Sequence, residues 1–274
     1  VGLALWRFHL PNPNMEHAWI NSVWPAEKIE IADLIMAFIL SAILLSNTYR
    51  CFSFIMGDLK FKVPLSIYIK QSKELIIHFL TQKKFGGCKD KIQWFVHLLI
   101  MTGYSVVFLL VVVFLAGGIE VIGLAWKPIA FQRDVIYSIW HPIRLLGYYA
   151  TFGIMYGTTY AIIGRLKKSK ATYKNSHATD WMFLILLQLT TLTGIMIHFT
   201  RLLDLPMTTY VIYVVHLMIA VPMLVLEVPF AKWAHLAYRP VAIYLIKVKE
   251  EYNKSIEESA VRMPVPLPMK EGAS

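Results

Sequence analysis

Five stretches of the sequence are apolar and long enough to cross a membrane, and this feature constrains the fold more than any other. They cover roughly residues 31–50, 92–116, 138–163, 181–202 and 209–231. A helix needs about 20 apolar residues to cross the hydrocarbon core of a bilayer. Because backbone polar groups in lipid must be satisfied within the segment, each stretch is expected to be a helix. The predicted fold class is all-α, a polytopic membrane protein with five transmembrane helices in one bundle.

The composition agrees with a membrane protein and excludes an ordinary soluble domain. The chain is 57% hydrophobic and 16% charged, whereas soluble domains carry about 25% charged residues. We expect a membrane domain over 31–246, with the helix of the last stretch continuing past His235. The segment 1–30 is expected outside the cell, and 247–274 to form an extended cytoplasmic tail, since it is charged and then rich in proline.

The basic residues predict the orientation. Of the 27 Lys and Arg residues, 21 fall in the segments 50–91, 165–180 and 232–274. Cytoplasmic loops are enriched in Lys and Arg, so the N-terminus is expected outside and the C-terminus inside. The net charge of +10 follows from this basic inner face, and we do not expect nucleic-acid binding.

The segment 51–91 is too long for a simple hairpin. After Pro64 it mixes apolar residues with Lys70, Lys73 and Glu74. This pattern is typical of an amphipathic helix. We expect a helix that lies on the inner membrane surface or docks a partner.

The two cysteines and the first residues allow few conclusions. Cys51 and Cys88 are too few for an iron–sulfur cluster, and both are expected in the cytoplasm, where disulfides are rare. The first residues show no secretory signal, and Met15 is an alternative start to Val1.

Histidines at matched depth on different helices indicate haem ligation. Imidazole is rare in lipid-embedded helices because each buried polar nitrogen needs a partner. His97 enters the second stretch from the inside, and His235 follows the fifth stretch on the inside. We call these two residues the inner histidine pair, and we expect them to bind a haem b iron from opposite sides.

A second haem is expected near the outer surface. His216 lies early in the fifth stretch, His198 near the end of the fourth and His141 at the start of the third. We call these three the outer histidines. His216 is expected to be one ligand, with His198 as the first choice and His141 as the second choice for its partner. The other four histidines lie in exposed or interfacial segments and are not expected to be ligands: His9, His17, His78 and His177.

The spacing between His216 and His235 predicts a distorted helix. An α-helix turns by 100° per residue, so a separation of about 18 residues returns to the same face. These histidines are 19 residues apart, with Pro222 and Pro229 between them. Proline interrupts the backbone hydrogen bonds of a helix, and we expect a bulge or kink that lets both histidines face the bundle.

Charged residues near the histidines are candidates for binding haem propionates, which need basic or hydrogen-bonding neighbours. On the outer side Arg144 and Arg201 are each one turn from a histidine. On the inner side the candidates are Arg50, Lys91, Lys232 and Arg239. Each can instead be an ordinary interfacial anchor. Glu227, inside the hydrocarbon, is a candidate quinone contact or proton relay, and a structural hydrogen bond explains it equally well.

The motifs resemble those of the membrane cytochromes b typified by the nitrate reductase gamma subunit. The likeness is closer to the membrane subunits of heterodisulfide reductase and of the quinone-interacting membrane-bound oxidoreductase complex. It rests on HLLIMTGY, HPIRLLGYYATFGIMYG, LTGIMIHFTRL and VYVVHLMIAVPMLVLEVPFAKWAHLAYRPVAIYL, and it extends over about 75–245.

The resemblance implies five helices, one or two b-type haems and electron exchange with a membrane quinone in a prokaryotic plasma membrane. His97 and His235 would hold the inner haem and His216 one side of the outer haem. Relatives of the nitrate reductase type have a second histidine ten residues after the first on the second helix, where this chain has Val107. Since the chain lacks cluster ligands, the partner would be a cytoplasmic iron–sulfur subunit like that of heterodisulfide reductase, with or without a flavoprotein.

Two other functions remain open. In a small transporter, intramembrane His and Glu side chains would line a polar path, but the sequence shows no inverted repeat. In a purely structural anchor no cofactor would bind. We expect an electron-transfer subunit of a quinone-dependent oxidoreductase. This subunit is not expected to catalyse bond-making chemistry by itself.

Overall fold

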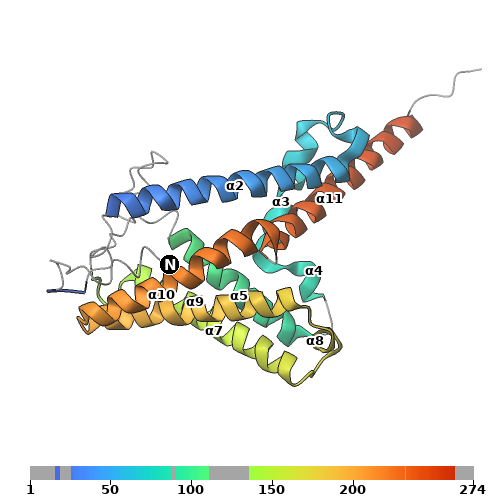
Figure 1. The fold of residues 1–274 in the computed structure, drawn as a ribbon. Helices are drawn as coiled ribbons and strands as arrows, with labels where there is room; N and C mark the ends of the chain where they lie inside the picture. Colours follow the sequence, from blue (N-terminus) through green and yellow to red (C-terminus); the bar gives the residue numbers. More distant parts are fainter. Residues whose placement is uncertain (1–15, 19–25, 88–89, 111–135, 232, 263–274) are drawn as a thin grey trace, which may run out of the picture. The chain divides into compact units, whose positions relative to one another are not determined.

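The computed structural model describes residues 16–18, 26–87, 90–110, 136–231 and 233–262, and every element in these ranges is helical (Figure 1). The longer helices are α2 (Ala26–Met56), α3 (Leu65–Thr81), α5 (Lys91–Phe108), α7 (Pro142–Leu166), α9 (Ala178–Leu202), α10 (Pro206–Phe230) and α11 (Ala234–Arg262). The short ones are η2 (Gly57–Leu59), α4 (Lys83–Gly86) and α8 (Ala171–Lys174). The predicted all-α class is confirmed for these residues.

Four helices in the described residues are long and apolar enough to cross a membrane. They are Ile35–Leu59, Lys91–Phe108, Ala178–Leu202 and Pro206–Phe230. The expected third span, 138–163, forms the 25-residue helix α7, but its many Tyr, Thr and Gly residues leave it less apolar than these four. Its length of about 38 Å still exceeds the roughly 30 Å hydrocarbon core.

Several sequence predictions fall on residues outside the described ranges. They concern His9, the start at Val1 or Met15, Cys88, the end of the second stretch at 111–116, Lys232 and the tail 263–274.

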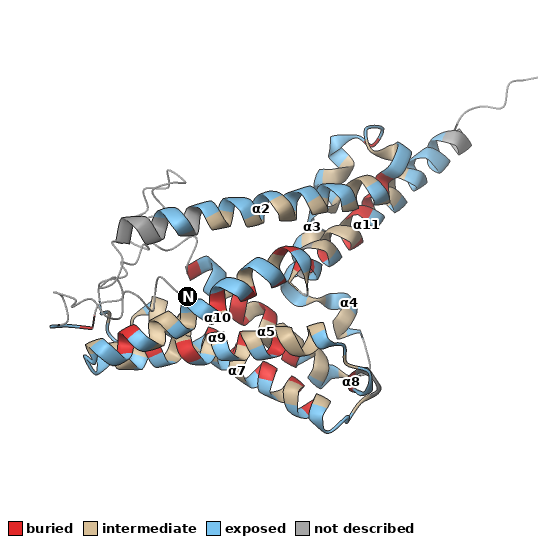
Figure 2. Cartoon of the chain, in the orientation of Figure 1, coloured by how far each residue is buried: buried red, intermediate tan, exposed pale blue. Residues whose placement is uncertain are grey.

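The helices form two compact units. The first, which we call the bundle unit, comprises Val1–Leu44 and Thr81–His235, and the second unit comprises Leu45–Leu80 and Leu236–Ser274. In the bundle unit α7 packs between α5 and α9, and α9 packs against α10 (Figure 1). Buried residues concentrate where these helices face one another (Figure 2). Proline at the first position of α7 and of α10 favours helix initiation there.

Glycines allow α5 and α7 to approach closely. A Cβ atom on Gly153 would lie 3.0 Å from the carbonyl oxygen of Leu99, and one on Gly157 would collide with Ile100 Cγ1. Small residues at such crossings let helix backbones pack against each other in membranes. The α5–α7 contact, which fixes the position of His97, therefore depends on these glycines.

The variant Gly157→Val is expected to destabilise the bundle by about 1–3 kcal/mol, because overpacking forces the two helices apart. Gly147→Val on the same helix is the matched control, since a Cβ there meets nothing within 4 Å. Thermal unfolding of the purified protein in detergent measures the difference. Equal melting temperatures for the two variants would show that the close approach does not contribute to stability.

The second unit has a small core of its own, formed by Met56, Val63, Leu245 and Val248. The Tyr244 hydroxyl donates to the backbone oxygen of Tyr68 at 3.0 Å, and Lys70 on α3 pairs with Glu251 on α11. The expected extended conformation is wrong for 247–262, which are helical as the end of α11. Apolar residues three to four apart, such as Leu245, Val248 and Tyr252, bind this part of the helix to the core.

The predicted distortion between His216 and His235 is confirmed. The helix was expected to continue unbroken past His235, but it is interrupted before that residue. α10 ends at Phe230, Ala231 has φ −126° and ψ −139°, and a new helix begins at Ala234. The break comes two residues after Pro229, whereas a proline disturbs the helical turn that precedes it. His235 thus begins α11 and is not held in the register of α10.

Candidate functional site

The structure brings the inner histidine pair together. His97 lies in the second turn of α5, and His235 is the second residue of α11. Their ring centres are 6.1 Å apart and their planes differ by 56°. His97 is half-buried and His235 is exposed, so neither ring is sealed within a packed core.

This separation fits two axial ligands of one metal. Two imidazoles that bind a metal from opposite sides place their ring centres about 6.3 Å apart, because each metal–nitrogen bond is about 2.0 Å and each ligating nitrogen lies about 1.2 Å from its ring centre. Rotation about the shared axis leaves the angle between the planes free, so 56° is compatible. No group of three or more His, Cys, Asp or Glu gathers in the described residues as a bare metal ion would require. Haem needs only two protein ligands, since the porphyrin supplies four nitrogens.

Gln82 orients the His97 ring. Its Oε1 lies 2.7 Å from His97 Nδ1, and since an amide oxygen only accepts, Nδ1 donates. The lone pair of that tautomer is on Nε2, the nitrogen that would bind iron. Gln82 has a left-handed backbone with φ +50°, and Phe85 contacts the same imidazole edge-on at 5.3 Å. No pattern in the sequence indicated Gln82, since it lies in a basic loop 15 residues before His97.

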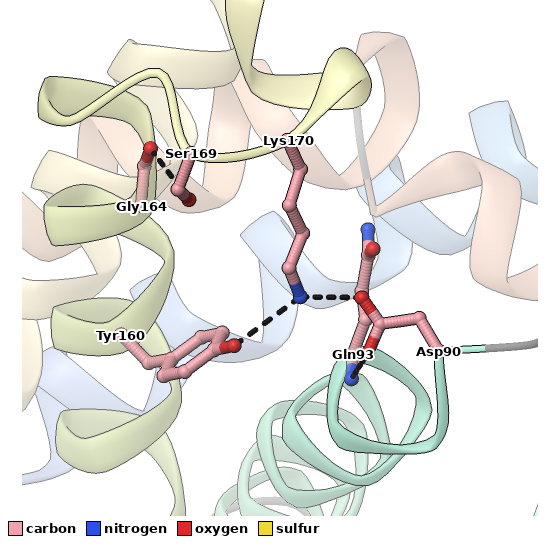
Figure 3. A network of polar contacts seen from close by, with 6 residues as sticks. All are labelled: Asp90, Gln93, Tyr160, Gly164, Ser169 and Lys170. Atoms are coloured by element: carbon pink, nitrogen blue, oxygen red, sulfur yellow. Dashed lines mark hydrogen bonds and ion pairs between the residues drawn. The ribbon is translucent and has the colours of Figure 1, made fainter.

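A polar network holds the start of α5, on which His97 lies (Figure 3). The Asp90 carboxylate caps this helix by accepting from the backbone N–H of Gln93 at 3.0 Å. It also pairs with the Lys170 ammonium at 2.5 Å. Lys170 also donates to the Tyr160 hydroxyl at 3.2 Å. The Lys170 ammonium lowers the pKa of Asp90, so the carboxylate stays ionised. The loop after α7 is thereby fastened to the start of α5.

The outer histidines have different partners. His216 Nδ1 lies 2.8 Å from Thr193 Oγ1, and that hydroxyl also donates to the Leu189 carbonyl. Thr193 therefore accepts from Nδ1–H, which places the lone pair of His216 on Nε2. His198 Nε2 is instead 2.8 Å from the Tyr148 hydroxyl.

The structure does not bring the outer histidines into ring contact. In the described part of the chain, no ring contact joins His216 to His198 or His141. His141, at the N-cap of α7, contacts the Tyr137 ring at 4.5 Å. For His198 to bind iron through Nε2, its hydrogen bond with the Tyr148 hydroxyl must break. The choice between His198 and His141 therefore stays a prediction.

The candidate propionate ligands differ between the two ends. In the outer region, Arg144 Nη1 is buried and has no hydrogen-bond partner among the described residues. Arg144 is one turn from Tyr148, the partner of His198, and Arg201 is one turn from His198 itself. An anionic group there, such as a haem propionate, would satisfy the buried Nη1 atom. Arg50 and Arg239 are exposed and belong to the second unit.

Glu227 is fully buried in α10. A carboxylate at this depth is costly unless it is neutral or paired. Close to it in sequence, Trp233 stacks on Tyr104 of α5 at 3.8 Å. Three of the remaining histidines have partners outside the candidate haem sites: His17 with Asp204, His78 with Glu74 and His177 with Thr179.

Comparisons with protein-family models, curated proteins and solved structures found no match. The resemblance to the membrane cytochromes b therefore stays a prediction from the sequence motifs. The functional interpretation depends on the geometry of the inner histidine pair and its neighbours.

Proposed function

We propose that this protein is a haem b-containing membrane subunit that passes electrons between membrane quinone and a cytoplasmic iron–sulfur or flavin partner. One observation carries the proposal: the imidazoles of His97 and His235, from separate helices, lie at the separation of two axial ligands. Gln82 supports it by fixing the His97 tautomer with Nε2 as the lone-pair nitrogen.

Each residue has a defined role in this proposal. Haem iron held by two imidazoles supplies one-electron transfer without a change of ligands. His97 and His235 hold the inner group, and His216, oriented by Thr193, holds the outer one with His198 or His141. Arg144 and Arg201 neutralise acidic groups at the outer end. Glu227 exchanges a proton with the quinone, whose reduction consumes protons.

The proposed topology has five spans, with α7 as the third, in a prokaryotic plasma membrane. The N-terminus is outside and the C-terminus inside, because the three basic segments must share the cytoplasmic side. The partner binds on that side. The chain has two cysteines, so any iron–sulfur cluster belongs to the partner.

The quinone role is tested with haem-loaded protein in liposomes to which a reduced menaquinol or ubiquinol analogue is added. We expect the quinol to reduce the haem, seen as a sharpened absorption band near that of the dithionite-reduced protein. If dithionite reduces the haem and neither quinol does, the quinone role is wrong while haem binding stands. A structural anchor or a transporter predicts no haem in either case.

Replacing Gln82 by Leu is expected to weaken haem binding at the inner site about 10–100-fold, since partners that orient a metal-bound histidine have effects of this size. Gln82→Glu keeps an acceptor for Nδ1–H and is the matched control. Haem titration of the apoprotein, followed by absorption, measures both variants. Equal affinity for Leu and Glu would show that Gln82 does not orient the ligand.

A further inference from the structure

Helix α3 carries an apolar stripe that no part of the described chain covers. Its members are strongly exposed: Leu65 by 71%, Ile69 by 64%, Ile76 by 57%, Phe79 by 40% and Leu80 by 58%. At 100° per residue these five side chains occupy an arc of about 100° on the helix. The spacing is that of one face of an amphipathic helix.

Other faces of α3 are already used. Ile67, opposite the stripe, and Tyr68, beside it, pack against the core of the second unit, and the Tyr68 carbonyl accepts the Tyr244 hydroxyl of α11. His78 is buried on the same side. The helix is therefore fixed by one face and presents the other outward.

The chain itself indicates what the stripe meets. The membrane-spanning candidate Ile35–Leu59 ends six residues before α3 begins at Leu65. The joining segment includes Phe61, which is 89% exposed. Lys60 lies over the Tyr49 ring at 4.4 Å, and Lys and Tyr are among the side chains that anchor spans at the membrane interface. Since α3 starts where a span ends, its stripe is within reach of the same bilayer.

Two exposed lysines lie next to the stripe. Lys62 comes three residues before α3 begins, and Lys73 lies on the helix at one edge of the arc. A helix with an apolar face bordered by lysines binds in the interface of anionic lipids, with the apolar side chains among the first acyl carbons. Lys70 lies farther round the helix and is used in the pair with Glu251.

We propose that α3 lies in the interface of an anionic leaflet, with Leu65, Ile69, Ile76 and Leu80 inserted, and that it anchors the second unit to the membrane surface. The occupant of the stripe is thus the lipid bilayer, and not a protein partner or a second copy. This proposal is independent of haem.

The test places a label on the stripe in the full-length protein. Ile76→Cys is made in a background with Cys51→Ser and Cys88→Ser, labelled with an environment-sensitive fluorophore and inserted singly into nanodiscs that contain phosphatidylglycerol. Asn253→Cys on the exposed side of α11 is the matched control. We expect a blue-shifted emission at position 76 and quenching by doxyl-labelled lipid at least about threefold stronger than at position 253.

Equal quenching at positions 76 and 253 would overturn the proposal. It would also be overturned if position 76 were shielded only when two copies share a disc or when a soluble partner is added. A second comparison tests the lipid charge. Lys62→Gln with Lys73→Gln is expected to reduce the quenching at position 76 in anionic discs about twofold or more and to leave it unchanged in neutral discs. Quenching that does not depend on lipid charge would overturn the selection of an anionic leaflet.

Discussion

Replacing His97 by Ala is expected to abolish haem binding at the inner site. The two rings lie 6.1 Å apart, and removal of one leaves the iron with a single imidazole and an open position. His235→Ala is expected to give the same loss from the other side. If two haems bind, either variant retains about half of the haem, measured per chain by pyridine haemochrome absorption. If only the inner site binds haem, either variant retains none.

The control for this result is His177→Ala. His177 caps the start of α9 and contacts Thr179, and it has no part in the proposed haem sites, so full haem content is expected. A folded His97→Ala protein with unchanged haem would contradict the assignment. Circular dichroism in detergent separates loss of haem from loss of the helical fold.

Replacing His216 by Ala is expected to remove the outer haem and leave the inner one. The lone pair of His216 is on Nε2 because Thr193 accepts from Nδ1, which prepares the ring to bind iron. Haem content is expected to fall by about half, and the double variant with His97→Ala is expected to hold no haem. Unchanged haem content in His216→Ala would show that His216 is not a ligand.

The partner of His216 follows from the same measurement on His198→Ala and His141→Ala. The variant that reproduces the loss identifies the second ligand. Tyr148→Phe separates two effects at His198, since it removes the hydroxyl that lies 2.8 Å from Nε2 but keeps the ring. If His198 is the ligand, Tyr148→Phe is expected to retain or raise haem affinity. A loss equal to that of His198→Ala would instead assign the Tyr148–His198 pair a structural role.

The four apolar helices were predictable, because apolar runs of this length must satisfy their backbone hydrogen bonds internally in a bilayer. A distortion between His216 and His235 was also predictable, since a separation of 19 residues does not return to the same helix face, but the full interruption after Phe230 was not. The helix to Arg262 was misjudged. Its many Lys and Glu residues were interpreted as an extended arm, although Leu245, Val248 and Tyr252 recur at helical spacing and pack on the core of the second unit.

The neighbours of the histidines were not predictable. Gln82, Thr193 and Tyr148 are ordinary polar residues in the sequence, and only the fold places them against imidazole nitrogens. Their positions depend on how α4, α7 and α9 turn around their axes, which the hydrophobic pattern does not determine to within one side chain. The apolar stretches, by contrast, can be read directly from the sequence, and the positions of His97 and His235 at their ends suggested a pair whose rings the structure places 6.1 Å apart.

Haem binding by paired histidines is tested most directly by a reduced-minus-oxidised absorption spectrum of the purified full-length protein, produced in cells supplied with a haem precursor. The expected result is the sharp band of low-spin haem b with two imidazole ligands, lost from the inner site in both His97→Ala and His235→Ala. A protein that is folded, helical and free of haem absorption would contradict it.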